Sequence, residues 1–176
     1  AFIHMNNQEI YYSVGPLLYC PADNTSVAAA VISQKFGTKF SLALCLEDTI
    51  NDNYVTEAED LLVSSIRNIY EALQVTDFFL PKIFIRVRSP EQIQSLSRRF
   101  GDSGELIAGY IIPKFSLANA DSYLGQVTEL NRGAGAAKYV MPIYESSAVV
   151  DLRTRYDVLY KLKEKLDLIE PWVLNI

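Results

Sequence analysis

Charged residues that could do chemistry stand directly after short apolar runs of this sequence. They are Glu47, Asp48, Arg86, Arg88, Lys114 and Glu145. Carboxylates are hard oxygen donors that suit Mg²⁺, which usually takes only one or two of them and fills its octahedron with water and substrate. A guanidinium can hold a substrate carboxylate through two parallel hydrogen bonds, whereas an ammonium acts as a point charge. If these residues meet, they could bind a metal ion and a small acidic substrate.

The apolar runs before these residues have the composition of buried β-strands. They recur along the chain at residues 16–20, 41–46, 82–87, 108–112, 138–143 and 172–176, with amphipathic stretches between them. Apolar strands joined by helical crossovers indicate α/β architecture with a parallel sheet that is covered on both faces. Functional groups collect at the carboxyl ends of strands in such folds, so the charged residues are predicted to converge at one mouth.

Several stretches between the runs carry signals that start helices. Thr56 and Glu59 match a capping box before an apolar stretch, and Ser89 is followed by Pro90, which suits the first position of a helix. The chain is therefore predicted to alternate strands and helices.

Each charged residue also has a plainer interpretation. Arg86 could form a structural ion pair with Glu47 inside the fold, and Glu47 with Asp48 could cap a helix in a solvated loop. Lys114 and Glu145 could be ordinary surface residues. The position of the whole set after successive runs favours a shared site over these separate interpretations.

Length, composition and charge narrow the class of protein. A chain of 176 residues with 49% hydrophobic content suits one domain with a sizeable core. The net charge is −5 and the basic residues form no run, which argues against a nucleic-acid partner. No apolar stretch reaches the roughly 18 residues that span a bilayer. Cys20 and Cys45 lie in apolar runs, which is typical of reduced thiols, so we expect a cytoplasmic protein without a membrane partner.

Taken in order, the motifs resemble those of the citrate lyase β-subunit-like family, also known as HpcH/HpaI aldolases. Residues 17–24 (LLYCPADN) resemble its LFVPG(N) segment, and residues 44–50 (LCLEDTI) resemble LDLEDAV. Residues 85–90 (IRVRSP), 109–114 (GYIIPK) and 141–146 (MPIYES) resemble VRVNPP, GVVLPK and PLIET. The resemblance implies a parallel (β/α)₈ TIM barrel. Residues 15–176 would be an incomplete barrel of about its first six strands, preceded by an N-terminal extension of residues 1–14.

The resemblance also implies roles for the residues in these motifs. Glu145 would be a Mg²⁺ ligand, and Arg86 would bind the carboxylate or carbonyl of the substrate. Glu47 and Asp48 would act beside Arg86 in catalysis by supporting the metal-bound waters and the acyl substrate. Lys114 would bind substrate from the rim of the site.

Arg88 and Asn24 are further candidates for substrate binding. The chain departs from the family pattern at Cys45, where the family usually has an aspartate, and at Arg88, where an asparagine is common. It also has Ala22 where a glycine helps the first loop approach an acyl–coenzyme A. The family's second metal ligand, an aspartate after the sixth strand, would lie beyond Ile176. These departures argue against the use of coenzyme A and indicate a divergent branch that acts on a different acyl or keto acid. A coenzyme A thioester stays one candidate substrate.

The expected function is that of a Mg²⁺-dependent carbon–carbon bond lyase or aldolase in a homo-oligomer. It would cleave a 3-hydroxyacyl thioester or a hydroxy-oxo acid through an enolate that the metal and Arg86 stabilise. The loss of an acidic residue at Cys45 motivates an alternative, a catalytically silent member that binds a small ligand or partner at the barrel mouth. A doubly wound sheet is a third interpretation, but residues 21–24 contain no glycine-rich phosphate loop.

Overall fold

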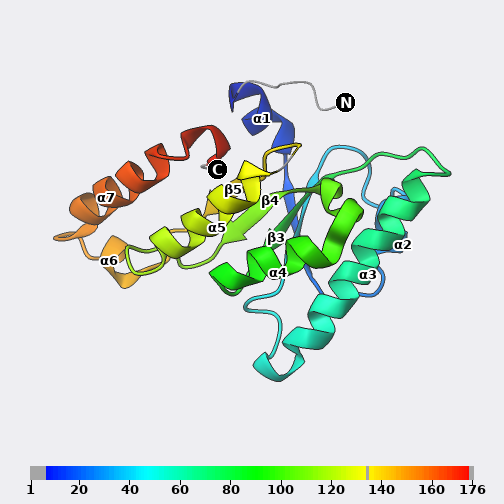
Figure 1. The fold of residues 1–176 in the computed structure, drawn as a ribbon, viewed down its shortest axis with the longest axis horizontal. Helices are drawn as coiled ribbons and strands as arrows, with labels where there is room; N and C mark the ends of the chain where they lie inside the picture. Colours follow the sequence, from blue (N-terminus) through cyan, green and yellow to red (C-terminus); the bar gives the residue numbers. More distant parts are fainter. Residues whose placement is uncertain (1–6, 134, 175–176) are drawn as a thin grey trace.

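The strands form one parallel sheet in which their spatial order is their order in the chain. The computed structural model describes residues 7–133 and 135–174 (Figure 1). Each strand of the sheet is hydrogen-bonded in parallel to the next, in the order β1 (Leu17–Pro21), β2 (Ser41–Cys45), β3 (Lys82–Arg86), β4 (Ile107–Ile112) and β5 (Tyr139–Pro142). This confirms the predicted α/β fold with a parallel sheet.

Helices and short 3-10 turns connect the strands. The α-helices are α1 (Asn7–Val14), α2 (Val27–Ile32), α3 (Val55–Leu73), α4 (Pro90–Phe100), α5 (Ala120–Arg132), α6 (Ser147–Val150) and α7 (Arg155–Asp167). The 3-10 turns are η1 (Asp52–Tyr54), η2 (Gly101–Leu106) and η3 (Glu170–Trp172). In Figure 1, α3, α4 and α5 lie in front of the sheet, and α2 packs on α3, α3 on α4, α4 on α5, and α5 on α7.

The single direction of strand order distinguishes a barrel from a doubly wound sheet. A doubly wound sheet reverses its strand order and carries connecting helices on both faces. Here the order does not reverse within the described residues, and the connecting helices follow one another along one face. This is the pattern of a (β/α) barrel, seen here as an open arc.

Alternate residues of the strands belong to two separate cores, because successive side chains point to opposite faces of a sheet. The core between sheet and helices includes Leu42, Leu44, Ile83, Ile85, Tyr110, Ile112 and Val140. The core on the inner face includes Ala43, Phe84, Ile111 and Met141, together with Leu174 and with Ile10 and Val14 of α1. Helix α1, from the segment expected to be an extension, therefore packs on the inner face of the sheet.

Contacts at the end of α1 fix where it lies along the strands. The hydroxyl of Ser41 donates to the carbonyl of Val14 at 2.5 Å, and the ammonium of Lys82 lies 3.5 Å from the carbonyl of Ser13. Because Ser41 and Lys82 begin β2 and β3, the C-terminus of α1 lies at the amino ends of the strands. The opposite ends of the strands remain available for a site.

The strands β1 to β5 lie within one residue of their predicted bounds, but two other elements differ more from the sequence prediction. Helix α3 begins at Val55 instead of after a cap at Thr56, because Asn51 starts η1 by accepting a hydrogen bond from the backbone N–H of Asn53, and η1 leads directly into the helix. The predicted strand 172–176 is a single parallel bridge between Val140 and Val173, preceded by η3. Residues 175 and 176 of that strand lie outside the described residues. No helix in the described part of the chain is long and apolar enough to cross a membrane.

Gly109 provides a test of the packing between β4 and β5. A Cβ atom at this position would lie 2.2 Å from the backbone oxygen of Tyr139, so Gly109→Ala should force the two strands apart. We expect a loss of about 3 kcal/mol in the free energy of unfolding, measured by urea denaturation. Gly125→Ala is the control, because this exposed helical position has open space and should gain about 0.5–1 kcal/mol. Equal stability of the two variants would contradict this description of the β4–β5 contact.

Candidate active site

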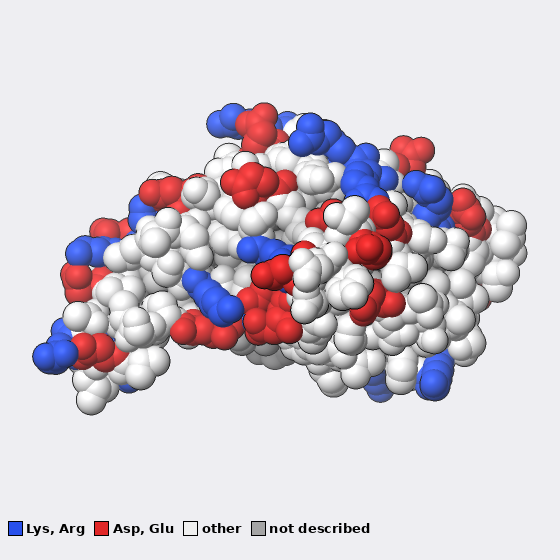
Figure 2. Space-filling view, turned by 90° about the horizontal axis from the view of Figure 1, so that it is seen from below, with Lys and Arg blue, Asp and Glu red and all other residues white. Residues whose placement is uncertain are grey.

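The charged residues predicted to meet do lie at one end of the sheet. Glu47 and Asp48 follow β2, Arg86 ends β3, Lys114 follows β4 and Glu145 follows β5. Because the strands are parallel and in chain order, their carboxyl ends share one edge. Figure 2 presents this end of the molecule, where basic and acidic side chains lie next to one another near the middle of the face.

Arg86 is the centre of this group. Its Nη2 atom lies 2.8 Å from Oε2 of Glu47, 3.1 Å from Oδ2 of Asp48 and 3.4 Å from Oε1 of Glu145. Its Nε atom also donates to Oε2 of Glu47, at 3.1 Å. The side chain of Arg86 is only 13% exposed. One guanidinium thus joins acidic residues that follow β2 and β5.

Glu47 is held on its second oxygen as well. Nζ of Lys114 donates to Oε1 of Glu47 at 2.8 Å. Burial acts to raise the pKa of Glu47, but the hydrogen bonds from Lys114 and Arg86 outweigh it and lower that pKa from 4.5 to about 2. The pKa of Arg86 is raised, since its pairing with Glu47 outweighs its burial. At neutral pH Glu47 and Arg86 therefore form a charged pair.

Lys114 has a backbone conformation that is rare outside glycine. Its φ angle is +51°, in the left-handed region that costs a non-glycine residue free energy. The side-chain amide of Asn119 donates to the carbonyl of Lys114 at 3.0 Å, and Asn119 Oδ1 accepts from the backbone N–H of Ser116 at 2.9 Å. The loop after β4 is therefore fixed by its own hydrogen bonds in the conformation that lets Lys114 contact Glu47.

The other two predicted substrate-binding residues have local partners. The guanidinium of Arg88 contacts the loop after β2 and pairs with Asp52. Oδ1 of Asn24 accepts from the backbone N–H of Ser26 at 2.9 Å, and its Nδ2 lies 3.1 Å from Sγ of Cys20. Asn24 thus shapes the turn before α2, and no described contact joins it to Arg86.

Two further residues next to members of the charged group were given no binding or catalytic role from the sequence. Cys45 is buried and is the register partner of Arg86 on the neighbouring strand. Ser146 follows Glu145, and its hydroxyl is buried without a hydrogen-bond partner among the described residues. Buried hydroxyls usually have a partner, and a bound water would satisfy the hydroxyl of Ser146. Its position one residue after Glu145 was the signal available in the sequence.

The donor atoms of this group suit a hard divalent cation. Three carboxylates face two cationic side chains, which leaves one excess negative charge. The side chains of Asp48 and Glu145 are 60% and 39% exposed, whereas Glu47 is 12% exposed and committed to its two partners. No cluster of three His, Cys, Asp or Glu ligands forms in the described part of the chain. Mg²⁺ needs only one or two protein carboxylates, so the set fits it.

A parallel sheet wound in one direction, with its charged residues at the carboxyl ends of the strands, defines the TIM-barrel class of α/β domains. A family model described as a C–C bond lyase of the TIM-barrel fold matches residues 8–176. The chain belongs to this family, which confirms the resemblance in the sequence motifs. No curated protein matches the chain.

Two similar solved structures come from Mycobacterium tuberculosis. The first is a citrate lyase β subunit complexed with oxaloacetate and magnesium, with 19% identity, a TM-score of 0.45, and coverage of 79% of this chain and 52% of that one. The second is a citrate lyase β subunit with 19% identity, a TM-score of 0.44, and coverage of 83% and 54%. This chain spans about half the length of both structures.

The pKa of Glu47 leads to a prediction about stability and pH. Because folding lowers this pKa to about 2, the carboxylate stabilises the folded state above its ordinary pKa of 4.5, and this contribution is lost as the pH falls towards 2. Glu47→Gln should therefore be less stable than wild type at neutral pH, and the difference should shrink as the pH is lowered from about 5. Urea unfolding at several pH values measures it, with Glu71→Gln on the exposed side of α3 as the control. A difference that does not change with pH would contradict the ion pairing of Glu47.

Proposed function

We propose that this chain forms the substrate-binding and metal-binding part of a Mg²⁺-dependent carbon–carbon bond lyase. The observation that carries the proposal is the fixed position of Arg86 among Glu47, Asp48 and Glu145 at the carboxyl ends of the strands. Family membership supports the class of reaction. The substrate would be a 3-hydroxyacyl thioester or a hydroxy-oxo acid. A coenzyme A carrier, a homo-oligomeric state and a cytoplasmic location stay predictions.

The metal-binding role belongs to the exposed acids. Glu145 would hold Mg²⁺, with Asp48 supporting its bound waters. A bound Mg²⁺ supplies Lewis-acid stabilisation of negative charge on a substrate oxygen. The excess negative charge of the cluster supports cation binding at this position.

The substrate-binding role belongs to the cations. Arg86 would take the substrate carboxylate or carbonyl through its planar fork, which fixes the orientation of the bond to be cleaved. Lys114, whose side chain is 60% exposed, would attract an anionic substrate from the rim. Glu47 keeps both cations in position through hydrogen bonds at 2.8 Å from each.

Cleavage requires a group that accepts the proton of the substrate hydroxyl. A pKa of about 2 makes Glu47 a weak proton acceptor at neutral pH, because an effective base has a pKa near the working pH. We therefore assign positioning to Glu47, and we propose a bound water, another carboxylate or a group of the substrate as the proton acceptor.

A second candidate function is small-ligand binding without catalysis. The observation that favours it is Cys45, a buried thiol that neighbours Arg86 where the family usually has an aspartate. Calorimetry with Mg²⁺, followed by an assay over 3-hydroxyacyl thioesters and hydroxy-oxo acids, separates the two functions. Binding of an oxo acid with no cleavage of any substrate would favour the silent member.

Glu145→Gln tests the metal site. The variant removes one ligand charge but keeps the shape of the side chain, so Mg²⁺ affinity should fall at least about tenfold and Mg²⁺-dependent cleavage should be lost. The fold should persist, because the side chain is partly exposed. Glu129→Gln is a matched control, since Glu129 is an exposed acid that pairs with Arg132 on α5. Unchanged metal affinity in Glu145→Gln, measured by calorimetry, would overturn the assignment.

Arg86→Lys tests the substrate-binding role. An ammonium keeps the charge but loses the planar fork, so kcat/KM should fall about a hundredfold while circular dichroism reports an intact fold. Lys114→Ala should have a smaller effect, because Lys114 lies exposed at the rim. Steady-state kinetics on the best substrate of the panel measure both. An Arg86→Lys enzyme as active as wild type would exclude bidentate binding by Arg86.

A further inference from the structure

The loop between β2 and η1, residues 46–51, carries two of the acidic residues of the site. Glu47 and Asp48 reach Arg86 only if this loop keeps its path. It has no helix or strand structure of its own. What fixes its backbone therefore determines the geometry of the site.

Arg88 contacts the backbone of this loop at three points. Its Nη1 atom lies 3.2 Å from the carbonyl oxygen of Leu46, 3.2 Å from that of Glu47 and 2.9 Å from that of Ile50. Its Nη2 atom pairs with the carboxylate of Asp52, which begins η1. We propose that Arg88 is a positioning residue that holds residues 46–51 so that Glu47 and Asp48 stay on Arg86. Its link to turnover rests on the proposed lyase function.

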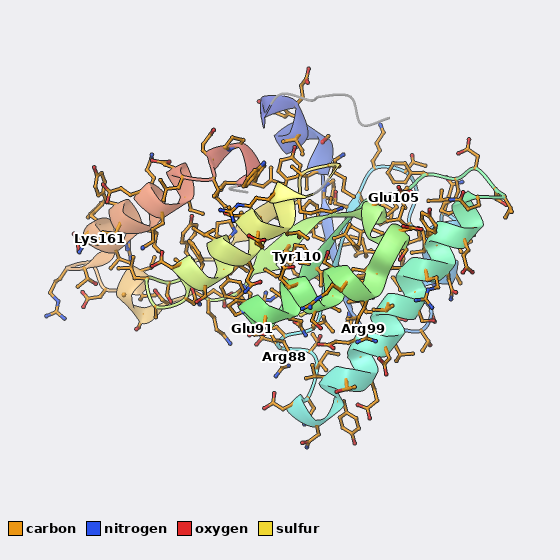
Figure 3. The ribbon with its side chains drawn as sticks, in the orientation of Figure 1. Arg88, Glu91, Arg99, Glu105, Tyr110 and Lys161 are labelled. Carbon is orange, nitrogen blue, oxygen red and sulfur yellow. The ribbon has the colours of Figure 1, made fainter. Side chains whose placement is uncertain are left out.

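Arg88 is itself anchored to the helix layer. Its backbone N–H donates to Oε1 of Gln92 at 2.8 Å, and Nε2 of Gln92 donates to Oε1 of Glu59 at 2.6 Å. Gln92 is buried at the start of α4, and Glu59 belongs to α3. Figure 3 labels Arg88 near the start of α4, at the lower end of the molecule. The clamp on the loop is thus connected to two helices.

Two arginines at the end of β3 hold different parts of the same loop. Arg86 binds the side chains of Glu47 and Asp48, whereas Arg88 binds backbone carbonyls on either side of them. With Nη1 among three carbonyl oxygens and Nη2 on Asp52, the Arg88 fork is already occupied by the protein. This supports positioning by Arg88 in place of direct substrate contact. A lysine would keep the charge, but it could not reach the carbonyls and Asp52 with one planar group.

Hydrogen exchange of the intact protein tests the clamp without requiring turnover. Arg88→Ala should raise amide exchange in peptides covering residues 46–52 at least about tenfold, because hydrogen bonds to a charged donor are stronger than ordinary ones. Arg98→Ala is the matched control, since Arg98 is an exposed arginine whose guanidinium contacts the Gln94 carbonyl of its own helix. It should leave both exchange and turnover unchanged.

Asp52→Ala separates the carbonyl contacts from the ion pair. Asp52 is 88% exposed, and exposed ion pairs contribute little, so this variant should keep near wild-type exchange in the loop. Guanidinium added to Arg88→Ala at millimolar concentration should restore protection, whereas methylammonium should not. Loop exchange in Asp52→Ala equal to that in Arg88→Ala would overturn the carbonyl clamp.

Kinetics connect the clamp to the site. In an active enzyme, Arg88→Ala should lower kcat about tenfold to a hundredfold with a smaller change in KM, because it misplaces Glu47 and Asp48. If Arg88→Ala does not fold, Arg88→Lys replaces it, with intermediate loop exchange as the expected result. A wild type without lyase activity would refute the proposed function and leave the exchange test valid. Wild-type exchange in residues 46–52 of a folded Arg88 variant would refute the clamp.

Discussion

A nearly buried guanidinium among acidic side chains is the interaction on which this site depends. The side chain of Arg86 is 13% exposed, and a charge withdrawn from water to that extent is costly unless it is paired. Glu47 supplies the main pairing and is equally buried, so each residue requires the other. Asp48 and Glu145 are more exposed, so in the proposed function these two acids would exchange Arg86 for a ligand while the pair stays in place.

The inner face of the sheet serves different purposes along one strand. In β3, Lys82 lies near the C-terminus of α1, Phe84 is buried in the inner core, and Arg86 reaches the site. These residues share a face because strand side chains alternate, and Ile83 and Ile85 between them pack against the helices. The apolar middle of β3 thus separates the end of the strand that contacts α1 from the end that carries the candidate site.

How much of the fold could be predicted depended on whether each signal was local. Ser89 and Pro90 start α4 as predicted, because the N-cap and the first helical position are set by neighbouring residues. Thr56 does not start α3, since Asn51 begins a 3-10 turn that continues into the helix at Val55. The capping-box pattern could not reveal this competing start one turn earlier.

The sequence by itself determined which charged residues meet. Glu47, Arg86, Lys114 and Glu145 each end or follow a strand, and parallel strands in chain order bring their carboxyl ends to one edge. Only the tertiary structure decided what each side chain contacts. The partners of Arg88 are backbone carbonyls of an earlier loop. Every residue has a backbone carbonyl, so the residue types in the sequence do not show which carbonyls will lie near Arg88. The path of the folded loop decides this.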